Sequence, residues 1–170
     1  MKKALFLDRD GIVNIDKNYL YKFEDVEWVD GIFDLIRYAN QKDWLVIVLT
    51  NQSGIERGFY QKEDAEKLHL QMSSFILSNY GLVIDDFFYC PYLDGPDRKP
   101  NPGMMLRAAE IYDLDLSKCY MVGDKESDAL NLTGPQYFLV GENFSIKRSD
   151  VFCCKDLHEV LEKIKINEDL

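Results

Sequence analysis

The sequence predicts an α/β fold in three layers, with a mostly parallel sheet of about five to six strands and helices on both of its faces. Short apolar runs alternate with helical stretches along the chain, which is the pattern of βαβ units. The chain has 170 residues, which is the size of one domain. Its 46% hydrophobic and 29% charged residues are typical of a packed globular protein. We therefore expect a single domain over residues 1–170.

The first half of the chain is expected to alternate strand, helix, strand, helix. The apolar run Ala4–Leu7 predicts the first strand, and Leu45–Leu49 predicts the second. Apolar residues recur at helical spacing over residues 32–39, and the same spacing returns over residues 65–76. Each helix follows one strand and precedes another, so both are expected to be crossover helices.

The second half continues the alternation. Three further strands are predicted, at Asp86–Tyr89, Tyr120–Val122 and Tyr137–Val140. Pro102 and Gly103 open a helix that runs to Ile111, because proline is tolerated in the first turn, where its missing N–H is not needed. Apolar residues at helical spacing over residues 157–164 predict a last helix.

Charge and hydropathy argue against two classes of partner, nucleic acids and membranes. The chain has 20 Lys and Arg against 30 Asp and Glu, a formal net charge of −10, which is the wrong sign for gripping nucleic acid. Its longest apolar run, residues 44–49, is far shorter than the roughly 18 residues of a membrane span. The apolar stretch before Asp8 is too short for a signal peptide. We expect a cytoplasmic protein without nucleic-acid or membrane partners.

Ionisable and amide side chains gather just after the first four expected strands. They are Asp8 and Asp10; Thr50, Asn51, Gln52 and Ser53; Arg98 and Lys99; and Asp124 and Lys125. In an open α/β sheet, ligands bind in the crevice beyond the carboxyl ends of the strands. The four segments are therefore expected to converge on one binding crevice.

The acidic residues of this crevice predict a metal site. Asp8 and Asp10 are two positions apart, so on an extended backbone both side chains leave the same side. Crowded carboxylates repel, which raises a pKa or recruits a cation. With Asp124 as a third acid and no His or Cys nearby, the oxygen ligands suit Mg²⁺. Asp128 is either a solvated acid in the first turn of a helix or a residue that contacts the metal ligands without binding the metal itself.

The remaining polar residues predict a phosphate site. The ammonium of Lys99, the hydroxyl of Thr50 and the backbone around Asn51 are groups that bind phosphoryl oxygens. Neither histidine lies near these motifs, and His69, inside a helical pattern, is expected on the surface. A histidine-based hydrolase is therefore not indicated.

Four motifs in this order resemble the haloacid-dehalogenase (HAD) superfamily of aspartyl phosphatases, which has a Rossmann-like fold. They are Asp-Arg-Asp-Gly at 8–11, Thr-Asn-Gln-Ser-Gly at 50–54, Arg-Lys-Pro-Asn-Pro-Gly-Met at 98–104, and Val-Gly-Asp-Lys at 122–125 with Asp128 beyond. Residues 14–19 and 51–58, and Arg98 beside Lys99, look most like the D-glycero-D-manno-heptose 1,7-bisphosphate 7-phosphatases. Histidinol-phosphate phosphatases are close relatives of that family.

The resemblance implies a two-step hydrolysis. Asp8 would be the nucleophile that forms an aspartyl phosphate, and Asp10 would be the general acid and then the general base. The carboxylates of Asp8 and Asp124 and the backbone carbonyl of Asp10 would bind Mg²⁺. The phosphoryl group would be held by Thr50, Asn51, Arg98 and Lys99. Other parts of the substrate would meet Arg98, Asp16, Lys17, Asn18, Tyr19, Gln52, Ser53 and Lys125.

Two features depart from relatives in the resembled superfamily. Relatives often carry a zinc loop built as Cys-x-His and Cys-x-Cys, but residues 90–97 here retain Cys90 alone, so no structural zinc is expected. Asn18 stands where relatives often have glycine, and asparagine tolerates a left-handed backbone. Crossover helices occupy the stretches where many members insert a cap domain. Without a cap, the loops at 14–21 and 55–60 are expected to supply specificity.

The expected function is Mg²⁺-dependent hydrolysis of the 7-phosphate of a heptose 1,7-bisphosphate, a step towards nucleotide-activated heptose. The expected partner is a small sugar phosphate, and the chain is expected to be monomeric. Histidinol phosphate or another small sugar phosphate is the competing substrate. Two competing functions are those of an uncapped protein phosphatase and of a non-catalytic binding protein with the HAD fold.

Overall fold

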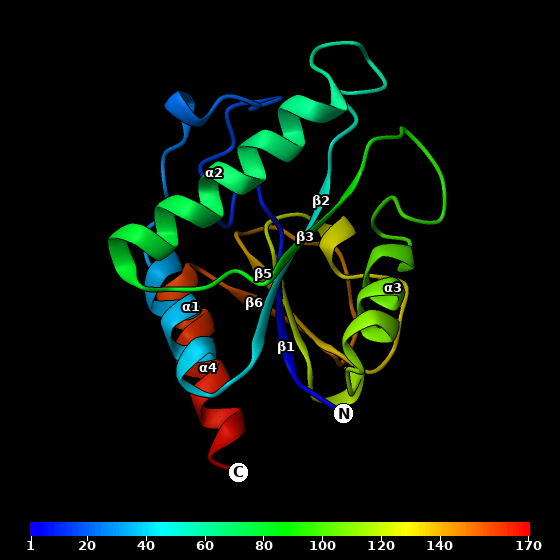
Figure 1. Ribbon diagram of the computed structural model, residues 1–170. Helices are drawn as coiled ribbons and strands as arrows, with labels where there is room; N and C mark the ends of the chain where they lie inside the picture. The colour runs from blue at the N-terminus through cyan, green and yellow to red at the C-terminus, as the bar shows by residue number, and fades with distance from the viewer.

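Six strands and four α-helices alternate along the chain in the computed structural model, which describes residues 1–170 (Figure 1). The strands are β1 (Ala4–Leu7), β2 (Leu45–Asn51), β3 (Asp86–Cys90), β4 (Tyr120–Gly123), β5 (Gln136–Val140) and β6 (Val151–Cys154). The helices are α1 (Ile32–Gln41), α2 (Lys62–Tyr80), α3 (Gly103–Tyr112) and α4 (Leu157–Glu168). Three short 3₁₀ helices complete the set, η1 (Phe23–Asp25), η2 (Leu116–Lys118) and η3 (Glu126–Asp128).

The six strands form one parallel sheet in the order β3-β2-β1-β4-β5-β6. The strand order reverses between β1 and β4, which is where an open α/β sheet forms its ligand crevice. The loops that follow β1, β2 and β3 lie together at one edge of the sheet, and both termini lie at the opposite edge (Figure 1). The predicted convergence of the motifs therefore follows from the topology.

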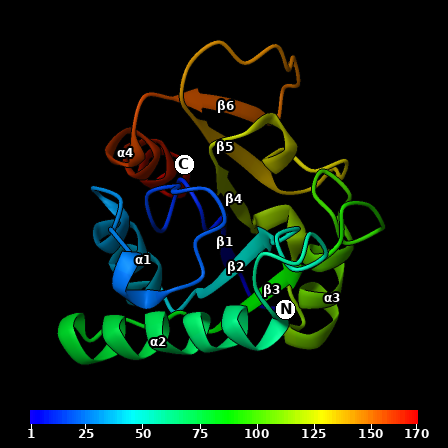
Figure 2. The same cartoon turned by 90° about the horizontal axis from the view of Figure 1, so that it is seen from above.

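Two hydrophobic cores flank the sheet, as the three-layer prediction requires. Leu5 and Leu7 of β1 pack with α1, α2 and α4, whereas Ala4 and Phe6 point to the opposite face and pack with α3. Figure 2 shows the same division, with α1, α2 and α4 on one side of the sheet and α3 on the other. Alternate residues of a strand face opposite ways, so a fully apolar β1 is buried on both sides.

Strand β6 is the element that the pattern did not predict. It pairs only with β5, at the edge of the sheet, and its Phe152 and Cys153 are exposed. A short edge strand without apolar alternation carries little sequence signal. The other strands start or end within two residues of their predicted bounds. No helix of the structure is both long and apolar enough to cross a membrane.

Candidate active site

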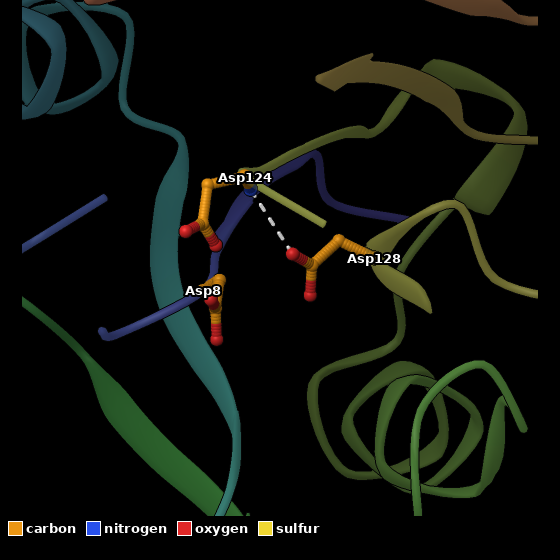
Figure 3. A group of neighbouring side chains, drawn as sticks. All are labelled: Asp8, Asp124 and Asp128. Carbon is orange, nitrogen blue, oxygen red and sulfur yellow. Dashed lines mark hydrogen bonds between the residues drawn. The ribbon is translucent and has the colours of Figure 1, made fainter. Parts of the chain in front are cut away.

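Three aspartates converge at the switch point of the sheet. Asp8 follows β1, Asp124 follows β4 and Asp128 ends η3, and one carboxylate oxygen from each lies within 4.8 Å of the others (Figure 3). Asp128 Oδ2 accepts the backbone N–H groups of Asp124 at 3.0 Å and of Lys125 at 3.1 Å. Asp128 is buried, so it supports the loop after β4 rather than facing solvent.

Two motif glycines make room for these acids. A Cβ on Gly11 would lie 2.1 Å from Asp124 Oδ2, and the backbone there has a φ of +97°. A Cβ on Gly123 would lie 2.1 Å from the Cβ of Asp128. Real Cβ atoms do not approach other heavy atoms so closely, so any side chain at either position would push an acid out of the cluster.

Lys99 links two of the acids. Its Nζ donates to Asp8 Oδ1 at 2.7 Å, to Asp128 Oδ1 at 2.6 Å and to the carbonyl of Leu49 at 2.8 Å. Asn51 holds the Lys99 backbone from both sides, because its Oδ1 accepts the Lys99 N–H and its Nδ2 donates to the Lys99 carbonyl. The ammonium is thereby fixed at the carboxyl end of β1.

The charges in this cluster do not balance. Burial, and then repulsion by Asp128, raise the pKa of the Asp8 carboxyl well above its usual range. Burial also raises the pKa of Asp124. For Lys99, burial alone would lower the pKa, but its ion pairs with Asp128 and Asp8 outweigh burial and raise it. Lys99 and the more exposed Lys125 thus face three carboxylates, and a further positive charge would relieve the remaining repulsion.

The donors in this cluster fit Mg²⁺. Asp124 Oδ1 is buried and accepts no hydrogen bond, although Lys125 Nζ lies 3.5 Å away, so it has an unused lone pair next to Asp8. The ligands offered are carboxylate oxygens, which suit a hard cation. An orphaned acceptor in an electronegative pocket is what removal of a cation would leave. The residues present thus match the metal that the sequence predicts.

Asp10 is not part of this cluster, and its carboxylate is held by a different set of donors. Arg9 Nη2 donates to both of its carboxylate oxygens, at 3.1 and 3.0 Å. Asn14 Nδ2 donates to Oδ1 at 3.0 Å, and Gln52 Nε2 donates to Oδ2 at 3.1 Å. Tyr60 in turn donates its hydroxyl hydrogen bond to Gln52 Oε1. The carboxylate is oriented from three sides while still reaching the pocket.

A polar pocket of about 280 Å³ opens over these residues. Twelve of the residues predicted from sequence line it: Asp8, Asp10, Asp16, Asn18, Tyr19, Asn51, Gln52, Ser53, Arg98, Lys99, Lys125 and Asp128. Tyr60 and Ser127 complete the lining. The pocket thus joins the loops that follow β1, β2, β3 and β4, with acids and Lys99 at its floor.

Comparison with known proteins identifies the family. A family model described as HAD-hydrolase-like matches residues 97–131. D-glycero-alpha-D-manno-heptose-1,7-bisphosphate 7-phosphatase from Campylobacter jejuni is 43% identical, over 96% of this chain and 96% of the relative. The corresponding beta-heptose enzyme of Helicobacter pylori is 37% identical, over 96% of this chain and 98% of the relative. The chain belongs to the heptose bisphosphate phosphatase family of HAD-like hydrolases.

A solved structure agrees with this family assignment. The D,D-heptose 1,7-bisphosphate phosphatase from B. bronchiseptica, crystallised with magnesium and phosphate, superposes with a TM-score of 0.83 at 31% identity. The match covers 98% of this chain and 99% of that one. The HAD-like fold predicted from the motifs is thereby confirmed.

In the present chain, three of the predicted site residues do not line the pocket. Thr50 is buried, and its Oγ1 accepts from Gln52 Nε2 at 2.7 Å. Lys17 forms an ion pair with Glu27. Asp124 belongs to the acidic cluster but does not line the pocket. The hydroxyl of Thr50 therefore contacts an amide in this structure, and the Lys17 ammonium contacts Glu27.

The expectation for His69 was wrong. This residue of α2 is only 5% exposed, and its Nε2 lies 3.1 Å from Nη1 of the fully buried Arg9. Burial, reinforced by the Arg9 charge, lowers the pKa of His69 to about 3, so the ring is neutral. The helical spacing in the sequence could have predicted this burial, because the buried face of α2 consists of positions 65, 68, 69, 72 and 76.

The two loops expected to supply specificity meet at the mouth of the pocket. Asn18 and Tyr19 both have left-handed backbones, with φ of 55° and 57°, as expected for Asn18. The Tyr19 ring packs edge-on against Phe59, with centroids 4.7 Å apart. Across the pocket, Lys125 Nζ lies 3.4 Å from Asp16 Oδ2. Aromatic packing and an ion pair thus hold the mouth in shape.

The loop between β3 and α3, where no structural zinc is expected, is held by polar contacts. The Arg107 guanidinium pairs with Asp97. Asn101 Nδ2 donates to the Gly95 carbonyl at 2.8 Å, and the Gly103 N–H donates to the Pro96 carbonyl at 2.9 Å. Arg98 Nη1 also donates to the Tyr92 carbonyl at 3.2 Å, so contacts within the loop hold Arg98 beside the pocket.

Proposed function

We propose that this chain is a Mg²⁺-dependent phosphatase that removes the 7-phosphate of D-glycero-D-manno-heptose 1,7-bisphosphate through an aspartyl phosphate. The observation that carries the proposal is the contact of the Lys99 ammonium with Asp8, beside the Asp124 carboxylate oxygen that accepts no hydrogen bond. The proposed nucleophile Asp8, the phosphoryl-binding Lys99 and the metal-binding Asp124 are therefore neighbours. The names of the family members supply the substrate.

Asp8 is the proposed nucleophile. One of its oxygens is held by Lys99 at 2.7 Å, and the other would attack phosphorus. The new phosphorus–oxygen bond forms as the bond between phosphorus and the sugar oxygen breaks. Lys99 would neutralise charge on the transferred phosphoryl oxygens. Asn51 supports this role, because it anchors the Lys99 backbone by a pair of hydrogen bonds.

Asp10 is the proposed proton carrier. It would donate a proton to the departing sugar oxygen and then accept a proton from the water that hydrolyses the aspartyl phosphate. Its carboxylate lines the same pocket as Asp8 but is not part of the acidic cluster. The two carboxylates would therefore act on the bound phosphate from different positions in one pocket.

The carboxylates of Asp8 and Asp124 and the carbonyl of Asp10 are the proposed Mg²⁺ ligands. When bound, the metal supplies positive charge to the nucleophile and to the phosphoryl oxygens. Asp128 keeps the loop after β4 in place through its two backbone hydrogen bonds. Its ion pair with Lys99 also fixes the distance between the ammonium and the acids.

The rest of the substrate would bind at the mouth. Arg98 and Lys125 are the cationic groups there, and Asp16, Asn18 and Tyr19 come from the loop after β1. Relatives divide between alpha and beta heptose anomers. The proposed enzyme acts as a monomer. We place the reaction in the cytoplasm, where a nucleotide-activated sugar would be made.

Phosphate release from a substrate panel tests this proposal. The panel contains both anomers of the heptose bisphosphate, histidinol phosphate and a phosphopeptide, each with and without Mg²⁺. We expect a higher kcat/KM for a heptose bisphosphate than for the other substrates. A higher kcat/KM for histidinol phosphate would make that compound the substrate in place of heptose bisphosphate. A higher kcat/KM for the phosphopeptide would indicate a protein phosphatase. No turnover of any compound would indicate a binding protein.

A further inference from the structure

A buried polar chain runs from helix α2 to the carboxylate of Asp10. Arg9, which is fully buried, turns its side chain back over the neighbouring Asp10. Its Nε and Nη2 face the Asp10 carboxylate, while Nη2 also donates to the Leu20 carbonyl at 2.8 Å. Nη1, the remaining corner of the guanidinium, lies 3.1 Å from Nε2 of His69.

The chemistry of the two groups decides the direction of this last hydrogen bond. A guanidinium has only donors, so His69 Nε2 must be the acceptor. The ring is therefore neutral, with its hydrogen on Nδ1. The His69 ring is also stacked on Phe87 of β3, with centroids 4.5 Å apart. The acceptor thus has a fixed position between a helix and the edge strand of the sheet.

We propose that His69 is a positioning residue for Asp10, acting through Arg9. The guanidinium is planar and rigid, so an acceptor at Nη1 determines where the opposite edge of the group lies. That edge donates to both oxygens of Asp10. The inference rests on the proposed function, because orienting Asp10 affects the reaction only if Asp10 transfers the proton.

Proton transfer is sensitive to such positioning. A misplacement of about 1 Å can cost about a hundredfold in rate, and general acids contribute about a hundredfold or more. Asn14 and Gln52 also hold Asp10, so loss of His69 should displace the carboxylate rather than release it. We therefore expect a partial loss of activity confined to steps that need the general acid.

Leaving-group dependence separates this role from a purely structural one. A sugar oxygen must be protonated as it departs, whereas a nitrophenolate leaves without a proton. The test compares kcat/KM for heptose bisphosphate with kcat/KM for p-nitrophenyl phosphate in the wild type, His69→Leu and His69→Gln. Leucine removes the acceptor, and glutamine keeps one. His158→Leu is the matched control, because His158 is exposed and pairs with Asp30 away from the site.

We expect His69→Leu to lower kcat/KM for the sugar phosphate by at least about tenfold and to leave the aryl phosphate within about threefold. His69→Gln should recover most of the sugar phosphate activity, and His158→Leu should match the wild type. Equal losses on both substrates, or no loss on either, would overturn the proposal. Thermal unfolding of each variant checks that the folded fraction is the same.

A structural measurement decides the matter independently of turnover. Crystal structures of the wild type and His69→Leu should show Asp10 displaced and Arg9 Nη1 moved in the variant, with both restored in His69→Gln. Unchanged positions in His69→Leu would overturn the positioning role whatever the substrate. A wild type that hydrolyses neither phosphate would overturn the proposed function, while the crystal structures still decide whether His69 positions Asp10.

Discussion

Lys99 Nζ lies 2.7 Å from Asp8 Oδ1, although the two residues are 91 positions apart in the chain. Parallel pairing of β3, β2 and β1 brings the ends of these strands to one edge of the sheet. The contact places the positive charge of Lys99 beside the proposed nucleophile. A phosphate dianion would otherwise meet only carboxylates at the pocket floor.

Asp8→Asn is expected to abolish phosphatase activity and leave the fold intact. An amide is a poor nucleophile, and it supplies less charge to a metal. Phosphate release should fall by far more than about a hundredfold, which corresponds to about 3 kcal/mol of barrier. The exposed Asp43→Asn is the matched control. A residual rate above about a hundredth of wild type would exclude an aspartyl phosphate at Asp8.

Removal of Mg²⁺ is expected to abolish turnover, and its return should restore turnover. The three carboxylates outnumber the two neighbouring lysines, Lys99 and Lys125, so they repel a phosphate dianion unless a metal cation lies between them. Asp124→Ala should weaken Mg²⁺ binding most, because its free oxygen points into the cluster. Isothermal titration with Mg²⁺ measures the affinity, and the exposed Asp113→Ala serves as control. Undiminished activity in excess chelator would contradict the metal assignment.

Lys99→Met is expected to be inactive and less stable. The substitution leaves Asp8 and Asp128 buried without their shared partner. Breaking a buried ion pair from one side costs about 3–5 kcal/mol. Urea unfolding without Mg²⁺ measures the loss, with the exposed Lys118→Met as reference. A free energy of unfolding equal to that of the wild type would show that the pairs contribute nothing to stability.

The free energy of unfolding of the wild type is expected to decrease as the pH falls, because His69 is buried in its neutral form. Its pKa is lowered from 6.5 to about 3 in the folded protein, so below pH 6.5 the unfolded chain binds a proton that the folded protein does not. The contribution is complete above pH 6.5 and is lost as the pH falls towards 3. Over that range the slope approaches about 1.4 kcal/mol per pH unit. Urea unfolding measures the free energy of unfolding at neutral pH and at pH 4.5. This free energy should fall less for His69→Gln than for the wild type. Equal decreases in the two proteins would contradict a buried neutral histidine.

The purified protein is expected to contain no stoichiometric zinc. A structural zinc site needs four thiolate or imidazole ligands, and the loop at residues 90–97 offers Cys90 alone. Elemental analysis and thermal unfolding with a zinc-selective chelator measure this directly. One tightly bound zinc per chain, released by Cys90→Ser, would show that other residues complete a site here.

Sequence pattern alone determined the sheet layers and the location of the candidate site. Apolar runs mark buried parallel strands, and residues that follow such strands share one edge of the sheet. Asp8, Lys99 and Asp124 could be predicted for this reason, and the order of the motifs indicated the family before any contact was known. The left-handed backbone at Asn18 was expected from the resemblance, because asparagine tolerates this conformation where relatives often have glycine.

Only the tertiary structure decided what each polar side chain contacts. It turned Thr50 towards Gln52, buried Asp128 against Lys99, and joined His69 to Arg9 across 60 positions. These contacts depend on side-chain directions that packing fixes after the sheet and helices come together. Strand β6 is defined in the same way, by its pairing with β5. Local periodicity records which faces are buried, but not which polar partners meet there, because those partners come from distant parts of the chain.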